Sequence, residues 1–103
     1  MTETVTRKRI EILVDTPLVS RIIRILQDAK VSGWSISHVD AGGGRDGSWQ
    51  HDELTGAAAK SLVLAIASEA NAGAFVDKLA PLLDSHRLLL TIGDVQVVRG
   101  ERF

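Results

Sequence analysis

Apolar and polar residues alternate along residues 7–14, and this pattern predicts a first strand with one buried face. Apolar residues then recur at helical spacing, which predicts an amphipathic helix that runs to about Val31. Its apolar stripe consists of Leu18, Val19, Ile22, Ile23, Leu26 and Ala29. Asp15-Thr16-Pro17 is a helix start signal, and Gly33 is expected to end the helix. Residues 1–6 are expected to be a flexible end.

The rest of the chain predicts four further strands, the last two of them short, and a second helix. Over residues 34–39, Trp34 and Ile36 alternate with serines, which predicts a strand with one buried and one wet face. An apolar run over residues 60–67 predicts the next strand. The second helix is expected to begin near Ser68 or Asn71 and to end or kink at Pro81. Residues 88–92 and 95–98 then predict two short strands, with a break at Gly93-Asp94.

This order of elements predicts an α+β fold of the ferredoxin-like βαββαβ type. Such a fold places two helices on one face of an antiparallel sheet. In the third strand Leu62, Leu64 and Ile66 lie on one side and Val63 lies on the other, so both faces of the sheet are apolar. Symmetric self-association would cover the face that the helices leave open. The length of 103 residues predicts a single domain, residues 1–103.

Composition excludes several classes of protein. A net charge of -1 provides no electrostatic footprint for nucleic acid. The absence of cysteine excludes disulfides and thiolate metal sites. No apolar run approaches the roughly 18 residues that span a membrane, and the first residues lack the apolar region of a signal peptide. We therefore expect a cytoplasmic protein with no membrane span.

A glycine-rich stretch follows the second strand. Gly42-Gly43-Gly44 can turn tightly and bring backbone N–H groups to a ligand, and Arg45 adds a planar donor suited to phosphate or carboxylate. The same pattern also fits a flexible connection without a ligand. The following residues, as far as Ala59, show no period and predict a mobile loop. Trp49 in this loop is expected to cover a ligand or a neighbouring subunit, or to fold back on its own domain.

Catalytic and metal sites have little support in the sequence. The three histidines, His38, His51 and His86, are far apart and lack the spacing of a metal site. Asp52 and Glu53 are adjacent, so their carboxylates are expected to point apart. No nucleophile has an obvious neighbouring base. The sequence therefore argues against an enzyme and against a bound metal.

The chain resembles the PII-type signal-transduction proteins over nearly its whole length. The resemblance rests on the order of elements and on three motifs, Gly33-Trp34-Ser35, Gly42-Gly43-Gly44-Arg45 and Val97-Val98-Arg99-Gly100-Glu101. The first and last motifs are similar to the PII-like branch linked with carboxysomes and bicarbonate transport. The resemblance implies a homotrimer with adenine nucleotides in the clefts between subunits. It also implies a T-loop, residues 44–59 here, that contacts a target protein.

The resemblance assigns roles residue by residue. It places an adenine contact at the start of the second strand, phosphate contacts at the glycine-rich T-loop base and in a second loop, and a phosphate contact from the C-terminal tail of an adjacent subunit. The nucleotide-binding residues implied in this way are Gly33, Trp34, Ser35, Gly42, Gly43, Gly44, Arg45, Arg87, Arg99 and Arg102. The T-loop residues expected to contact a partner are Asp46, Ser48, Trp49 and His51.

Departures from the family pattern narrow the expected function. Asp84-Ser85-His86-Arg87 replaces the family's glycine-aspartate-glycine-lysine motif, and Asp46 replaces a glutamine that nitrogen-sensing members use for 2-oxoglutarate and magnesium. The chain has no tyrosine to be uridylylated. We therefore expect a regulator that binds ADP or AMP, with ATP as a further candidate, together with bicarbonate and no tightly bound cofactor. Its expected target is a bicarbonate transporter or a carboxysome component.

Two alternatives stay open from the sequence. One is a metal- or anion-binding ferredoxin-like trimer of the divalent-cation-tolerance type, without adenine specificity. The other is a structural trimer with a vestigial cleft. Nucleotide-dependent thermal stabilisation separates both from a nucleotide sensor, because only the sensor requires it.

Overall fold

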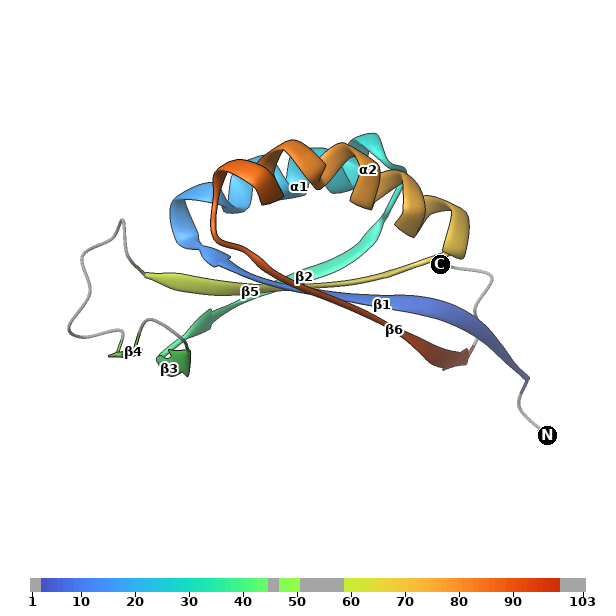
Figure 1. Ribbon diagram of the computed structural model, residues 1–103. Coiled ribbons are helices and arrows are strands. Elements are labelled where there is room, and N and C mark those ends of the chain that lie inside the picture. The colour runs from blue at the N-terminus through green and yellow to red at the C-terminus, as the bar shows by residue number, and fades with distance from the viewer. Residues whose placement is uncertain (1–2, 45–46, 51–58, 99–103) are drawn as a thin grey trace.

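Two helices cover one face of a four-stranded antiparallel sheet (Figure 1). This computed structural model describes residues 3–44, 47–50 and 59–98. The strands of the sheet are β1 (Thr4–Asp15), β2 (Gly33–Val39), β5 (Lys60–Ala67) and β6 (Leu89–Val98), in the order β2-β5-β1-β6. The helical layer contains η1 (Thr16–Leu18), α1 (Val19–Asp28) and α2 (Glu69–Ser85). The predicted ferredoxin-like βαββαβ arrangement is confirmed.

The hydrophobic core lies between the sheet and the two helices. Ile10, Ile12 and Val14 alternate along β1 and are buried, and their partners across β5 are Ala65, Val63 and Ser61. The helices add the buried side chains Ile22, Leu26, Ala72, Phe75, Leu79 and Leu82. The predicted apolar stripe of the first helix is therefore confirmed. Its remaining members pack against the core or are buried in it.

The first helix ends earlier than predicted, and glycine does not end it. α1 stops at Asp28, and the next turn is closed by bonds from the Lys30 amide to Gln27 O (3.0 Å) and from the Val31 amide to Leu26 O (2.9 Å). These two bonds form a Schellman motif, whose left-handed position is usually glycine. Here that position is Lys30, with φ 66°. Gly33 instead begins β2.

Pro81 lies inside the second helix, so the prediction that the helix ends near Ala80 is wrong. Ser68 caps the start of α2 as expected, because its Oγ accepts a hydrogen bond from the Asn71 amide at 3.1 Å. The helix continues through Pro81, which is exposed, to Ser85. Ser85 Oγ donates to the Pro81 carbonyl (3.1 Å). Burial of apolar side chains on both sides of Pro81 explains why the helix persists despite the missing N–H.

β6 is a single strand, so the predicted break at Gly93-Asp94 is also wrong. β1 begins at Thr4 and supplies a continuous partner, with Arg9 opposite Gly93. Lys8 Nζ lies 2.6 Å from Asp94 Oδ1, and Gln96 Nε2 donates to Thr6 Oγ1 at 2.9 Å. Residues 4–6, predicted to be flexible, are therefore part of the sheet. Pairing between β1 and β6 outweighs the local tendency of glycine to interrupt a strand.

The glycine-rich stretch forms a strand of its own. β3 (Ala41–Gly44) pairs with β4 (Gly47–Gln50) in a small antiparallel sheet, with Gly44 opposite Gly47. The sequence predicts no regular element in the loop from Arg45 to Ala59, so the strand at residues 47–50 corrects that prediction. The rest of that predicted loop, residues 45–46 and 51–58, lies outside the described residues.

The sheet face opposite the helices is apolar along β5 and at the adjoining ends of β1 and β6. We call it the open face and define it there by Leu13, Leu62, Leu64, Ile66 and Leu89. Leu62, Leu64 and Ile66 are half-buried, whereas Leu89 is 59% exposed. The prediction that both faces of the sheet are apolar is confirmed.

The edge strand β2 differs from its prediction. Its register places Trp34 and Ile36 on the helix side of the sheet, opposite Ala65 and Val63. Trp34 is nevertheless 38% exposed, and Ile36 is similarly exposed, so the face predicted to be buried is only partly covered. An edge strand has a neighbour on one side only, which leaves these side chains accessible.

We predict that Lys30→Gly stabilises the protein. A left-handed conformation costs a side-chain-bearing residue roughly 1–2 kcal/mol, and glycine's added freedom in the unfolded chain offsets part of that gain. The free energy of unfolding should therefore rise by about 0.5–1 kcal/mol, as measured by urea denaturation. Lys30→Ala is the control, because it removes the same charge and keeps the strain. Equal stabilities of the two variants would contradict the claim that the left-handed backbone conformation strains residue 30.

Candidate functional site

Segments far apart in the sequence meet in a hollow of about 260 Å³. Its lining comes from β1, β3, the start of β5 and the loop between α2 and β6. The lining residues are Leu13, Gly43, Gly44, Lys60, Arg87, Leu88 and Leu89. The hollow thus brings two cationic side chains and a glycine backbone to one place.

The antiparallel register determines where this hollow lies. β1 ends where β5 begins, with Asp15 opposite Lys60, and β6 begins beside them, with Leu89 opposite Leu13. Alternation along each strand places Lys60, Leu13 and Leu89 on the open face, since Val14 and Ser61 face the helices. The hollow therefore lies at one end of the sheet, on the open face.

Its chemistry suits an anion. Guanidinium and ammonium groups donate charge-assisted hydrogen bonds to phosphate or carboxylate. A Cβ added to Gly44 would meet nothing within 4 Å, so the backbone there is open to approach by a ligand. Lys60, Arg87 and the Gly43-Gly44 backbone together could hold a phosphate group.

Lys60 is held at the edge of the hollow by its surroundings. Its Nζ lies 2.5 Å from Asp15 Oδ1, and both side chains are partly exposed. The next residue, Ser61, is fully buried, and its Oγ lies 2.8 Å from Thr16 Oγ1 and 3.5 Å from His38 Nδ1. The Thr16 amide also donates to the Ala59 carbonyl at 2.8 Å. These bonds fix the start of β5 against the turn that follows β1.

The structure places the predicted site residues in two separate groups. Gly43, Gly44 and Arg87 meet in the hollow, next to Gly42 in β3. Gly33, Trp34 and Ser35 lie at the other end of β2, where Gly33 is opposite Ile66, whereas Val39 is opposite Lys60. Six residue steps at about 3.3 Å each separate these two ends by roughly 20 Å. The strand between the two groups is therefore about 13 Å long when measured from Ser35 and about 20 Å long when measured from Gly33.

Several predicted residues cannot be placed. Those that lie outside the described residues are Arg45, Asp46, His51, Arg99 and Arg102. For Ser48 and Trp49 only the backbone in β4 is described.

Lys60 was not predicted as a site residue. Its only local signal is its place at the start of an apolar run, and its role depends on the β1–β5 register.

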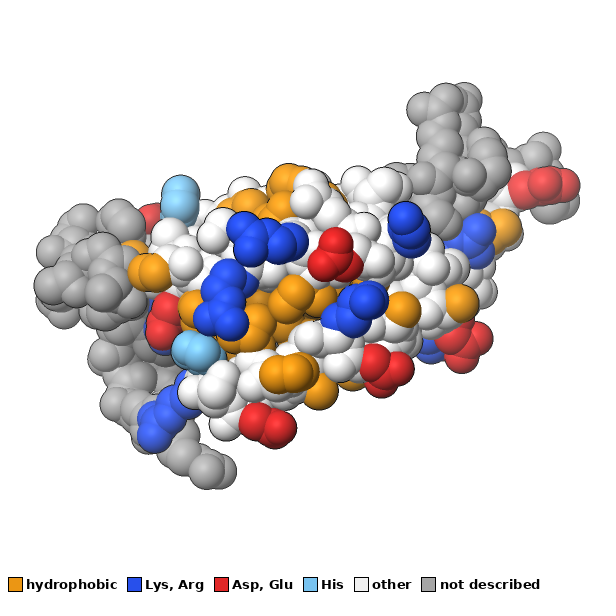
Figure 2. Space-filling view, turned by 90° about the horizontal axis from the view of Figure 1, so that it is seen from above, with side chains coloured by type: hydrophobic (Ala, Val, Ile, Leu, Met, Phe, Trp, Pro, Cys, Tyr) orange, Lys and Arg blue, Asp and Glu red, His pale blue; other side chains and the backbone are white. Residues whose placement is uncertain are grey.

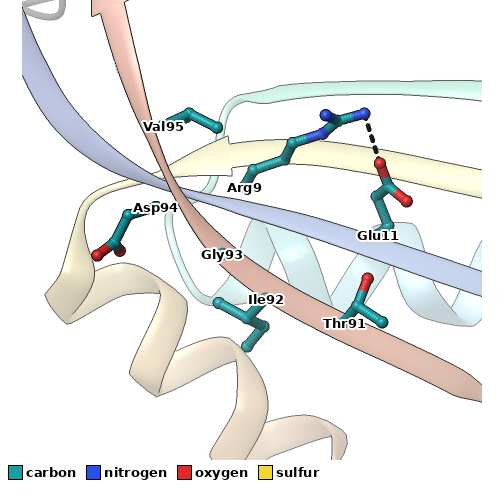
Figure 3. Close-up of a pocket in the computed structure, with 7 residues that line it drawn as sticks. All are labelled: Arg9, Glu11, Thr91, Ile92, Gly93, Asp94 and Val95. Carbon is teal, nitrogen blue, oxygen red and sulfur yellow. Dashed lines mark ion pairs between the residues drawn. The ribbon is translucent and has the colours of Figure 1, made fainter.

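Two other hollows mix acids with bases. One, of about 320 Å³, lies along β1 and β6, and Figure 3 shows Arg9 and Glu11 beside each other there, joined by an ion pair. The other, of about 240 Å³, contains Arg7, Lys8, Glu69 and Asp94. There the hydrogen bond that Lys8 donates to Asp94, together with the negative charge of Asp94, raises the pKa of Lys8. Each of these hollows has acidic groups in its lining, whereas the lining of the first hollow has none.

The surface on the helix side of the molecule carries both positive and negative charges. Figure 2 shows basic and acidic side chains interspersed there with hydrophobic ones. Nucleic-acid binding requires a one-sided basic surface.

Within residues 3–44 and 59–98, no cluster of His, Asp and Glu could hold a metal ion. In the same part of the chain, no helix is long and apolar enough to cross a bilayer.

Comparisons with solved structures find the same fold. CPII, a nitrogen regulatory PII-like protein from Thiomonas intermedia K12 bound to ADP, AMP and bicarbonate, is 21% identical, with a TM-score of 0.89 over 100% of this chain and 98% of that chain. A PII-like signalling protein from Thermus thermophilus is 20% identical, with a TM-score of 0.81 and 98% of each chain covered. The B. subtilis GlnK–ATP complex is 12% identical, with a TM-score of 0.62 over 87% of this chain and 82% of that one.

Of two sequence comparisons, one finds no relative and the other identifies a family. A search of curated proteins finds no significant match to this chain. The family model for nitrogen regulatory protein P-II, however, matches residues 7–102, which is nearly the whole chain. The βαββαβ fold and the matched residues lead to one conclusion: this chain belongs to the P-II family of regulatory proteins.

Proposed function

We propose that this protein is a non-enzymatic regulator whose hollow binds the phosphates of an adenine nucleotide, with ADP and AMP preferred and ATP a further candidate. The observation that carries the proposal is the convergence of Lys60 and Arg87 on the open backbone of Gly44. Two cations and backbone donors match the charge and geometry of a diphosphate. The fold likeness to CPII, which has been solved with ADP and AMP, supports the adenine nucleotide as the ligand.

The nucleotide site is shared between copies of the chain in this proposal. The adenine group (Gly33, Trp34 and Ser35) lies four to six residue steps, roughly 13–20 Å, from Lys60 of the phosphate group (Lys60 and Arg87) within one chain. A neighbouring copy can bring its own adenine group to this chain's hollow. The partly exposed ring of Trp34 offers an apolar surface on which a base can stack. Three copies packed through their open faces would also cover the exposed apolar residues there.

The segment from residue 44 to residue 59 acts as the signalling T-loop of a single domain, residues 1–103. It begins at Gly44, the last residue of β3, and the chain re-enters the four-stranded sheet at Lys60; both residues line the hollow. Ligand binding there can therefore bias the conformations of the segment that reaches a partner. Asp46, Ser48, Trp49 and His51 are its proposed contact residues, and Arg45, Arg99 and Arg102 are further proposed phosphate contacts.

Bicarbonate is proposed as a second ligand. Bicarbonate is bound in CPII together with ADP and AMP. This likeness supports a role in inorganic-carbon uptake. In this proposal the protein acts in the cytoplasm, and its target is a bicarbonate transporter or a carboxysome component.

Calorimetric titration of the protein with ADP tests the proposal. We expect micromolar binding close to one nucleotide per chain, and a change in ADP affinity when bicarbonate is added. The protein should also gain thermal stability with ADP, because a ligand that binds the native state stabilises it. Absence of both binding and stabilisation would refute the nucleotide-sensor function and favour the metal- or anion-binding alternative.

We predict that Arg87→Gln weakens ADP binding by about tenfold or more. A hydrogen bond to a charged group contributes about 1.5–3 kcal/mol, and glutamine retains a donor but not the charge. Lys60→Met should have a comparable effect. The matched control is Arg24→Gln, which removes an exposed arginine on α1 away from the hollow. If Arg87→Gln and Arg24→Gln bind ADP equally well, Arg87 does not contact the ligand.

A further inference from the structure

One of the two basic side chains that line the hollow already forms an ion pair with an acidic side chain outside the lining. Asp15 is directly opposite Lys60 across the β1–β5 pair, and its Oδ1 lies 2.5 Å from Lys60 Nζ. Lys60 lines the hollow, whereas Asp15 is not among the lining residues. The ammonium group that an anion in the hollow would contact is therefore in contact with a carboxylate of the protein.

This arrangement has a consequence for any anion that enters the hollow. An ammonium group has three donors, but a ligand oxygen that approaches Lys60 also approaches the negative charge of Asp15. The repulsion from Asp15 grows in proportion to the charge of the ligand. The carboxylate therefore acts most strongly against the most highly charged ligands.

The other described ion pairs lack this arrangement. Lys8 and Asp94 both line one hollow, and Arg9 and Glu11 both line another. Only for Lys60 and Asp15, among the described pairs, does the base line a hollow that its acid does not. Asp15 is thus positioned to modulate a site without blocking it.

We propose that Asp15 is a specificity-determining residue of this hollow. It is the resident counter-ion of Lys60, which a ligand anion must displace or share, and it lowers affinity in proportion to ligand charge. The inference rests on the proposed function, because it assumes that the hollow takes an anion. It adds that the preference between nucleotides of different charge is set by a carboxylate that does not itself bind the ligand.

The test is the substitution Asp15→Asn, with ADP, AMP and inorganic pyrophosphate as separate calorimetric probes. Asparagine keeps the size of the side chain and removes its charge. We expect pyrophosphate and ADP to bind roughly three- to tenfold more tightly, as for loss of one partly exposed charge near the ligand. AMP should gain less, so the ratio of ADP affinity to AMP affinity should rise.

Two further variants separate charge from shape. Asp94→Asn is the matched control, because it removes the acid of a similarly close ion pair with Lys8, five residue pairs along β1 and β6 from Leu13 and Leu89 of the hollow. It should leave all three affinities unchanged. Asp15→Glu restores the charge and should return the ratio of ADP to AMP affinity to the wild-type value. A general disturbance of the fold would not change this ratio selectively.

The outcomes distinguish this inference from the proposed function. If the wild type binds ADP, the proposed function is upheld. If Asp15→Asn then binds ADP and pyrophosphate no more tightly than the wild type does, the inference about Asp15 is overturned. If the wild type binds neither nucleotide, the function fails. The inference then depends on pyrophosphate alone, which must bind Asp15→Asn more tightly than the wild type. If Asp15→Asn does not bind pyrophosphate either, both fail.

Discussion

The antiparallel pairing of β1 with β5 is the constraint on which the rest of the structure depends. It places Ile10 and Ile12 beside Ala65 and Val63, so that a single register buries the centre of the core. A shift of one residue would turn these side chains to the open face. The same register sets Asp15 against Lys60 and thereby places a cation at the end of the sheet where β3 and the loop after α2 arrive. The stability of the fold and the chemistry of the site thus share one cause.

The length of the strands has a second consequence. β2 and β5 run side by side over seven residue pairs, with Gly33 at one end and Lys60, which lines the hollow, at the other. In the proposed shared site, a ligand that uses both groups contacts two copies of the chain. Binding of that ligand and assembly of the copies are then linked, because each stabilises the other. The exposed apolar side chains of the open face are consistent with such an assembly.

The sequence predicts the features that depend on repeated patterns and misses those that depend on tertiary pairing. The alternation in β1, the run in β5 and the stripe of α1 predict the fold, because burial of an apolar face dominates folding. Pro81, Gly93 and Lys30 mislead local rules, because packing keeps the helix and the strand intact and places a lysine where glycine is usual. The glycine run points to Gly43 and Gly44, and the family resemblance points to Arg87, but Lys60 has no motif. Only the register shows that Lys60 joins them.

A complementation experiment tests the shared site most directly. Trp34→Ala should impair the adenine group, and Arg87→Gln the phosphate group. Each variant alone should bind ADP weakly. When the two variants are refolded together in equal amounts, random assembly makes about one quarter of the interfaces intact, because each interface draws one group from each of two copies. Equilibrium dialysis should then recover tight ADP binding at about that fraction of the wild-type stoichiometry. No recovery in mixed assemblies would contradict a site built between copies.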